Sequence, residues 1–354
     1  MSDKKIQHFV PKFYFRQFSK DGNSVCLLIK KDGHFVPAAP IRHQASKDNF
    51  YGNKEIEELI SKIEGGISPV LKKLVSNGTL GSLSDADMEL VLISTLLQYS
   101  RTLKEREFYH PMFEESVKMF LEVGINNDES LTESEKRETV LVLEDLKIDP
   151  LKGHLETVSF MLQSSQHIED LFPVLLINKT NRPFIFSDAP VIFHNAYMGE
   201  VKSSGVTGLR TAGLQIIYPL SSDKCLLLVD KNKYQIKQLI EGNVVNVREL
   251  KDIQSINLMQ IHSSDASIYF SDAKFKEYVY HLWKGQRKKF KDRKMVKEVF
   301  KLPSNDASVT RELEKRYSHL LPVNLNLSFL KHEVLNDSEY LYFQKHHPHM
   351  VERL

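Results

Sequence analysis

Three ionisable side chains interrupt otherwise apolar or turn-forming stretches of this sequence, namely His8, Arg101 and Asp188. Together they would supply a base, an anion clamp and a carboxylate, which are the groups that phosphodiester cleavage needs. We therefore predict catalytic roles for His8 and Asp188, and substrate-binding roles for Arg101 and for two polar neighbours in the same stretches, Gln98 and Ser187. The sequence identifies no cofactor, although a divalent metal ion held by Asp188 would suit this reaction.

The same three residues also fit a purely structural interpretation. Buried charges are tolerated when they are paired, so Arg101 and Asp188 could form a buried ion pair, with His8 hydrogen-bonded to a helix terminus. Such a cluster would lock a helical part of the chain onto a sheet. Glu57 and Glu64 leave a similar choice open, because residues seven apart on one helix face are either additional metal ligands or solvated carboxylates.

A dense run of positive charge lies towards the C-terminus, where eight cations are opposed only by Asp292. The run consists of Lys284, Arg287, Lys288, Lys289, Lys291, Arg293, Lys294 and Lys297. Trp283 and Phe290 interleave with these charges, and we expect a helix over about 273–297. A positive helix face of this kind can bind the phosphates of DNA or RNA, or an acidic partner protein.

The elements that would position the polar residues follow from the spacing of the apolar ones. Apolar residues at helical spacing predict one long helix from Ser84 to about Tyr109, which carries Gln98 and Arg101 on one face, and Pro111 can start the next helix. Asp188 follows a β run, and the end of a strand is a rigid base for site residues.

The whole pattern indicates an α+β protein in which a helical bundle packs against an antiparallel sheet. We predict four parts in chain order: an N-terminal aromatic helix and hairpin (1–52), a helical bundle (53–171), an antiparallel sheet region with a helix (172–272) and a basic helical C-terminal segment (273–354). The aromatic helix should lie between the bundle and the sheet, because its aromatic residues occupy more than one face.

Composition narrows the class of protein further. The chain has 354 residues and a formal net charge of +2, so its overall charge does not demand a nucleic-acid partner. Cys26 and Cys225 lie far apart in apolar runs, which is typical of buried thiols in a reducing compartment. The start of the chain has no apolar signal region, and no run is long enough to cross a membrane. We therefore expect a cytoplasmic protein without a membrane partner.

Four segments of the sequence together resemble a known family. They are Gln7–Pro11 with the following Tyr14 and Phe18, Gln98–Thr102, Pro183–Val191, and Gly213–Gln215 with Tyr218–Ser221. In this order they are similar to the domain-of-unknown-function family 4238 of bacterial proteins, over about residues 5–270. The resemblance implies no reaction, substrate or catalytic residue, and the C-terminal part of the chain lies largely outside it.

Two functional hypotheses follow. The first is a nucleic-acid-acting effector, a nuclease or similar phosphodiesterase, with a role in bacterial anti-phage defence. No acidic-x-Lys pattern falls on a fitting strand, which argues against the restriction-type subclass of nucleases. The second hypothesis is a non-enzymatic protein-interaction module, in which the polar cluster is structural and the basic segment docks a partner protein.

Overall fold

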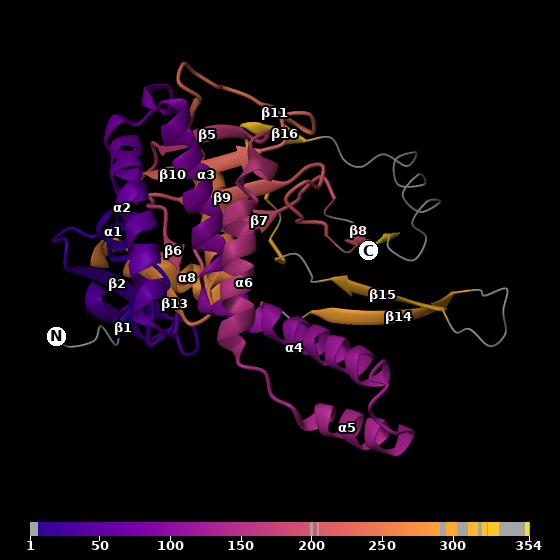
Figure 1. Cartoon of the computed structure of the whole chain (residues 1–354). Helices are drawn as coiled ribbons and strands as arrows, with labels where there is room; N and C mark the ends of the chain where they lie inside the picture. Colours follow the sequence, from indigo (N-terminus) through magenta and orange to yellow (C-terminus); the bar gives the residue numbers. More distant parts are fainter. Residues whose placement is uncertain are drawn as a thin grey trace.

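A computed structural model describes residues 6–198, 201–203, 205–290, 295–302, 311–317, 321–323, 325–332 and 351–353. It confirms an α+β fold in which helices pack against largely antiparallel sheets (Figure 1). The α-helices are α1 (Lys12–Arg16), α2 (Lys54–Asn77), α3 (Asp85–Ser100), α4 (Leu103–Asn126), α5 (Glu133–Asp145), α6 (Pro150–Gln163), α7 (Leu250–Ser263) and α8 (Lys276–Gln286).

Two sheets form the centre of the molecule. The five-stranded sheet has the order β12-β5-β10-β9-β7 and is antiparallel except where β12 runs parallel to β5. Its strands are β5 (Phe172–Asn178), β7 (Ile192–His194), β9 (Gln215–Pro219), β10 (Lys224–Val229) and β12 (Val244–Val247). The four-stranded sheet has the order β3-β2-β13-β6, with β2 (Ser24–Ile29), β3 (Phe35–Pro40), β6 (Phe186–Ser187) and β13 (Ser267–Phe270). The N-terminal hairpin therefore shares a sheet with strands from residues 186–270.

Four strand pairs complete the described β structure. They are β1 (Ile6–His8) with β4 (Ser46–Asp48), β11 (Tyr234–Ile236) with β16 (Leu330–His332), β14 (Val296–Leu302) with β15 (Arg311–Tyr317), and β8 (Val201–Ser203) with β17 (Val351–Arg353).

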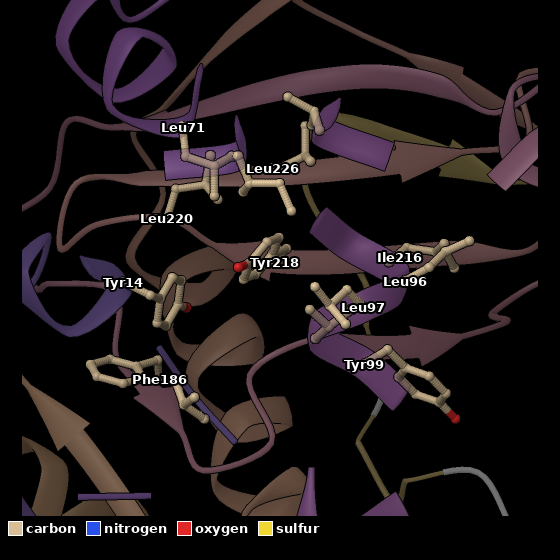
Figure 2. Close-up of a cluster of buried hydrophobic side chains, with 14 of the residues drawn as sticks. Tyr14, Leu71, Leu96, Leu97, Tyr99, Phe186, Ile216, Tyr218, Leu220 and Leu226 are labelled. Atoms are coloured by element: carbon tan, nitrogen blue, oxygen red, sulfur yellow. The ribbon is translucent and has the colours of Figure 1, made fainter. Parts of the chain in front are cut away.

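Helices cover both faces of the five-stranded sheet, as the alternation along β10 requires. Leu226 of β10 packs in one core with side chains from α2 and α3, whereas the next residue, Leu227, packs in a second core with α7. Figure 2 shows Leu71 of α2 and Leu96 of α3 in the first of these cores. Since the sheet is buried on both sides, its central strands read as continuous apolar runs.

The short helix α1 fills the space between the two sheets with aromatic rings. Tyr14 stacks on Tyr218 with ring centroids 5.3 Å apart, and it meets Phe186 edge-on at 5.2 Å (Figure 2). Phe15 packs edge-on against Tyr269 of the four-stranded sheet at 4.9 Å. The hydroxyl group of Tyr14 also donates to the carbonyl of Pro219. The aromatic N-terminus is thus part of the core, as its composition predicts.

The long helix expected from Ser84 to Tyr109 is divided in the structure. Helix α3 ends at Ser100 and α4 begins at Leu103, because the side chain of Thr102 caps α4 by accepting a hydrogen bond from the amide of Glu105. Arg101 therefore sits at the corner between two helices. The expected helix start at Pro111 is wrong, since this proline lies inside α4.

The C-terminal segment is not one continuous helix. Helix α8 ends at Gln286, a single 3-10 turn follows over Arg287–Lys289, and the chain is extended again from Val296. Residues 296–302 read Val-Lys-Glu-Val-Phe-Lys-Leu, and their β-branched and aromatic side chains favour a strand that pairs with β15. The expected helix to residue 297 is therefore wrong, and the helical description of 273–354 holds only for its first part.

Two further observations concern the described part of the chain. Cys26 and Cys225 are both free and buried. None of the helices within the described ranges is long and apolar enough to cross a membrane.

Candidate functional site

Arg101 occupies the centre of a buried polar network. Its side chain is 2% exposed, and all three of its nitrogen atoms donate hydrogen bonds. Nε donates to the hydroxyl of Tyr51 at 2.9 Å, Nη1 to Oε1 of Glu64 at 2.6 Å, and Nη2 to the main-chain carbonyl of His8 at 2.7 Å. Burial alone would lower the pKa of Arg101, but the neighbouring Tyr51 and Glu64 raise it above its ordinary value, so the guanidinium stays charged.

Gln98 acts on the same segment from one turn earlier in α3. Its Nε2 donates to the carbonyl of Phe9 at 3.1 Å, next to the carbonyl that Arg101 binds. Tyr51 strengthens this attachment, since its main-chain amide donates to Oε1 of Gln7 at 2.6 Å. The predicted pairing of Gln98 with Arg101 on one face is present, and what these two side chains bind is the backbone of the N-terminal strand.

The His8 ring is only partly buried and is separate from these contacts. It is the carbonyl of His8, and not its imidazole, that meets Arg101. Nε2 of the ring is buried and has no hydrogen-bond partner among the described residues. Burial, followed by the charge of Lys12, lowers the pKa of His8 to about 4, so the ring is neutral near pH 7. A neutral imidazole has the protonation state of a general base.

Asp188 directly follows edge strand β6 and organises the turn that leads into the neighbouring strand β13. Its Oδ1 accepts from the amide of Asp265 at 2.8 Å, and its Oδ2 accepts from the amides of Ala266 at 2.8 Å and Ser267 at 3.0 Å. Burial raises the pKa of Asp188 to about 6, although these amides favour the ionised form. The carboxylate is thus ionised near pH 7, and both of its oxygen atoms are engaged by backbone amides.

Ser187 joins a second set of buried hydrogen bonds beside Asp188. Its amide and its Oγ both donate to Oε1 of Gln260 in α7, at 3.1 and 3.0 Å. Nε2 of Gln260 donates in turn to the carbonyl of Pro190 at 2.8 Å. Ser187 therefore helps to fasten the 186–190 loop to α7.

The predicted site residues thus form two hydrogen-bond networks. One holds Gln98, Arg101 and the backbone of His8, and the other holds Ser187 and Asp188. In the described part of the chain no hydrogen bond or ion pair links Arg101 to Asp188, and the carboxylate partner of Arg101 is Glu64. Glu64, first considered as a metal ligand or a solvated carboxylate, is a member of the Arg101 network. No group of three or more His, Cys, Asp or Glu among the described residues could hold a metal ion.

The basic segment presents its cations to solvent. Lys284, Arg287, Lys288 and Lys289 are all exposed, and within the described ranges none of them forms an ion pair with a carboxylate. Lys297 differs, because its ammonium group pairs with Glu115 of α4. Three other predicted nucleic-acid-binding residues lie outside the residues that the structure describes: Lys291, Arg293 and Lys294.

Trp283 anchors this cationic segment to the body of the protein. Its Nε1 donates to the carbonyl of Lys30 at 2.8 Å, and its ring is 2% exposed. The ring packs directly onto Gly33, where an added Cβ would lie 2.5 Å from the indole. Gly33 has a φ of +74°, so this position needs glycine both for its conformation and for its lack of a side chain.

Sequence reasoning missed several partners that the structure reveals. Tyr51 gave no signal, and Glu64 was considered only as a metal ligand or a solvated carboxylate, because both residues lie far along the chain from Arg101. Asn257 and Gln260, in contrast, did carry a signal in the sequence. They occupy core-facing positions of α7 at helical spacing from Ile253, and polar residues at such positions need buried partners. Asn257 meets this need by accepting from the amide of Ile185 at 3.0 Å.

These features define an α+β protein in which two buried polar networks fasten the N-terminal strand and the 186–190 loop to helices. The chain belongs to the family described as Protein of unknown function (DUF4238), which matches residues 6–274. This confirms the resemblance carried by the four segments. Neither the curated proteins nor the solved structures contain a match to the chain.

Proposed function

We propose that this protein is a nucleic-acid-binding effector that holds phosphates with the cations following Trp283. The observation that carries this proposal is the set of four exposed cations, Lys284, Arg287, Lys288 and Lys289, which have no carboxylate partner in the described part of the chain. Cations that are not already paired can replace the counterions of a phosphate backbone, and the release of those counterions favours binding.

The attachment of the segment supports this role. The Trp283 indole fixes α8 to the turn after β2, so the cations that follow project from a rigid base. The ring of Phe290 lies among them, with the ammonium group of Lys30 at 4.8 Å from its centroid. Bases stack on aromatic rings in surfaces that bind single strands, and Phe290, unlike the buried Trp283, is partly exposed to such contact.

Cleavage of the bound strand, and a role in anti-phage defence, remain predictions. The geometry of the described residues favours a structural role for Arg101 and Asp188, since all of their polar side-chain atoms are engaged by protein groups. The proposal therefore rests on binding, and cleavage would need the His8 imidazole to act with groups other than these two.

Binding is tested by fluorescence anisotropy of labelled single-stranded DNA, duplex DNA and RNA over a series of salt concentrations. The test variant changes the four exposed cations of the segment, Lys284, Arg287, Lys288 and Lys289, to Gln. The matched control changes four exposed lysines elsewhere that lack ion pairs in the described structure, Lys47, Lys62, Lys72 and Lys251, to Gln.

The two variants have the same net charge, so a difference between them reports the location of the charge. We expect the test variant to bind more weakly. Its slope of log affinity against log salt should fall by about 3 with single strands and by about 4 with duplex DNA, at about 0.7 and about 0.9 respectively for each phosphate contact removed. The control should retain most of the slope. Equal slopes in the two variants, or a wild type that binds none of the three ligands at low salt, would refute the proposal.

A second candidate function, the protein-interaction module, is favoured by exposed apolar side chains on α4 and α5. Helix α5 buries none of its residues, and Figure 1 shows it extending away from the rest of the chain beside α4. The large exposed apolar residues are Met119, Phe120, Leu121, Val123, Leu141 and Val142. Apolar residues gathered on a surface are typical of protein contacts.

Sedimentation velocity of the wild type and of a Phe120→Ser/Val142→Ser variant tests association with a second copy of the chain. A wild type that stays monomeric at all concentrations would count against this self-association.

A further inference from the structure

A second basic feature lies on a different part of the surface, around β11 and β16. The structure has a solvent-open cavity of about 580 Å³ there, which is within the usual range for small-molecule sites. Its lining residues are Phe172, Lys231, Asn232, Lys233, Tyr234, Gln235, Ile236, Leu239 and Lys331. Figure 1 shows β11 and β16 near the top of the view, away from α8, which lies near mid-height.

Among the residues that the structure describes, the cavity lining includes three lysines and no carboxylate. Lys231 and Lys331 are exposed and form no ion pair within the described ranges, so both are available to an anion. Lys233 is held against the wall, where its Nζ donates to the hydroxyl of Tyr197 at 3.0 Å. Asp230, next to Lys231 in the chain, forms no ion pair with Lys231 or Lys331 in the described ranges, and its oxygen atoms accept from main-chain amides, including that of Asn232 at 2.9 Å.

The antiparallel pairing of β11 with β16 brings polar groups of the lining together. Gln235 and Lys331 are directly opposite each other in this pair, so their side chains leave the same face of the ribbon. Asn232 adds a second amide from the turn before β11. Amide side chains both donate and accept hydrogen bonds, as recognition of the edge of a nucleobase requires.

The remaining lining is apolar. Phe172 lies at the start of β5 and contributes an aromatic ring, and Ile236 and Leu239 contribute aliphatic surface. Leu239 is 40% exposed, so a ligand in the cavity would remove apolar surface from water. The cavity thus combines a cationic rim, two amides and an aromatic ring.

We propose that this cavity binds a nucleotide-class small molecule. Lys231 and Lys331 hold its phosphate, Asn232 and Gln235 contact the edge of the base, and Phe172 packs against the base. The proposal is independent of the function proposed above, because it uses none of the residues of the 284–289 segment.

Isothermal titration calorimetry on the full chain tests this proposal. The probes are AMP, GMP, CMP, UMP and inorganic phosphate, each titrated separately. The test variant is Lys231→Gln/Lys331→Gln, and the matched control is Lys237→Gln, an exposed lysine that follows β11 but does not line the cavity. Melting temperatures of all three proteins verify that these surface changes leave the fold intact.

We expect at least one nucleotide to bind at least tenfold more tightly than inorganic phosphate, to lose at least tenfold in affinity in the double variant, and to keep its affinity in the control. The Lys284–Lys289 variant should also keep it, which separates this site from the nucleic-acid surface. The proposal is overturned if no nucleotide binds, if phosphate binds as tightly as the nucleotides, or if the double variant binds like the wild type.

Discussion

Replacing Arg101 with methionine is the sharpest test of the structural role assigned to its network. Methionine keeps much of the side-chain volume but removes all three donors. The hydroxyl of Tyr51, the carboxylate of Glu64 and the carbonyl of His8 then lose their contacts with the guanidinium. If Arg101 instead held a substrate phosphate, its replacement would weaken substrate binding and leave the stability of the fold nearly unchanged.

The size of the effect follows from the burial of the network. Removing one member of a buried, hydrogen-bonded charge pair costs about 3–5 kcal/mol of unfolding free energy, since its partners stay behind without compensation. Arg101→Lys should cost about 2–3 kcal/mol, because an ammonium group cannot reach all three acceptors in the planar geometry that arginine offers. Glu64→Gln should cost only about 1 kcal/mol, since the Glu64 side chain is 23% exposed and its charge is partly screened.

Urea unfolding followed by far-UV circular dichroism measures these free energies. Arg287→Met is the matched control, because it makes the same chemical change at an exposed arginine and should alter stability by less than about 0.5 kcal/mol. The expected order of stability is wild type, Glu64→Gln, Arg101→Lys and Arg101→Met. An Arg101→Met protein within about 1 kcal/mol of the wild type would refute the structural assignment.

Three further perturbations have defined outcomes. His154 is a buried residue of α6, and burial lowers its pKa to about 4. Its contribution to stability is therefore present above its ordinary pKa of 6.5 and is lost as the pH falls towards 4. Over this window the wild type should lose about 2–3 kcal/mol more than His154→Gln in urea unfolding. The pH dependence of Asp188 has the opposite sign, because burial raises its pKa to about 6. Its contribution to the free energy of unfolding is greatest below about pH 4 and declines as the pH rises to about 6. Asp188→Asn should remove this decline and should cost about 1–3 kcal/mol through lost hydrogen-bond acceptors. Gly33→Ala should lower the melting temperature and raise the exposure of the Trp283 indole, which a red shift of its fluorescence would report. Gly22→Ala has a similar φ of +72°, but no atom of the described residues lies within 4 Å of the added Cβ, so this variant should leave the indole buried.

The sequence predicted the parts of this fold that depend on local patterns. Phe13, Tyr14 and Phe18 indicated a buried N-terminal helix, because together they place aromatic side chains on more than one face of a short helix. The spacing of Gln98 and Arg101 placed both side chains on one face, and the structure confirms that they bind consecutive carbonyls. Such inferences succeed because a helix fixes the geometry of residues three or four apart.

The sequence could not predict which distant residues would meet. Arg101 was expected to lie close to Asp188, either in a shared catalytic site or as a buried ion pair. Its carboxylate partner is instead Glu64, because the packing of α2 against α3 decides which carboxylate lies within reach. The break between α3 and α4 was missed as well. The capping pattern of Thr102 and Glu105 was present in the sequence, but the apolar periodicity continued across it and concealed the end of α3.

Photo-crosslinking tests the central claim, nucleic-acid binding by the segment after Trp283, most directly. The wild type is irradiated at low salt with oligonucleotides containing 4-thiouridine, and the adducts are mapped by mass spectrometry. We predict adducts on peptides that contain Tyr280 or Phe290, and their loss in the variant with Gln at positions 284, 287, 288 and 289. The claim would be contradicted if the wild type gave no adduct, or if its adducts lay elsewhere and persisted in that variant.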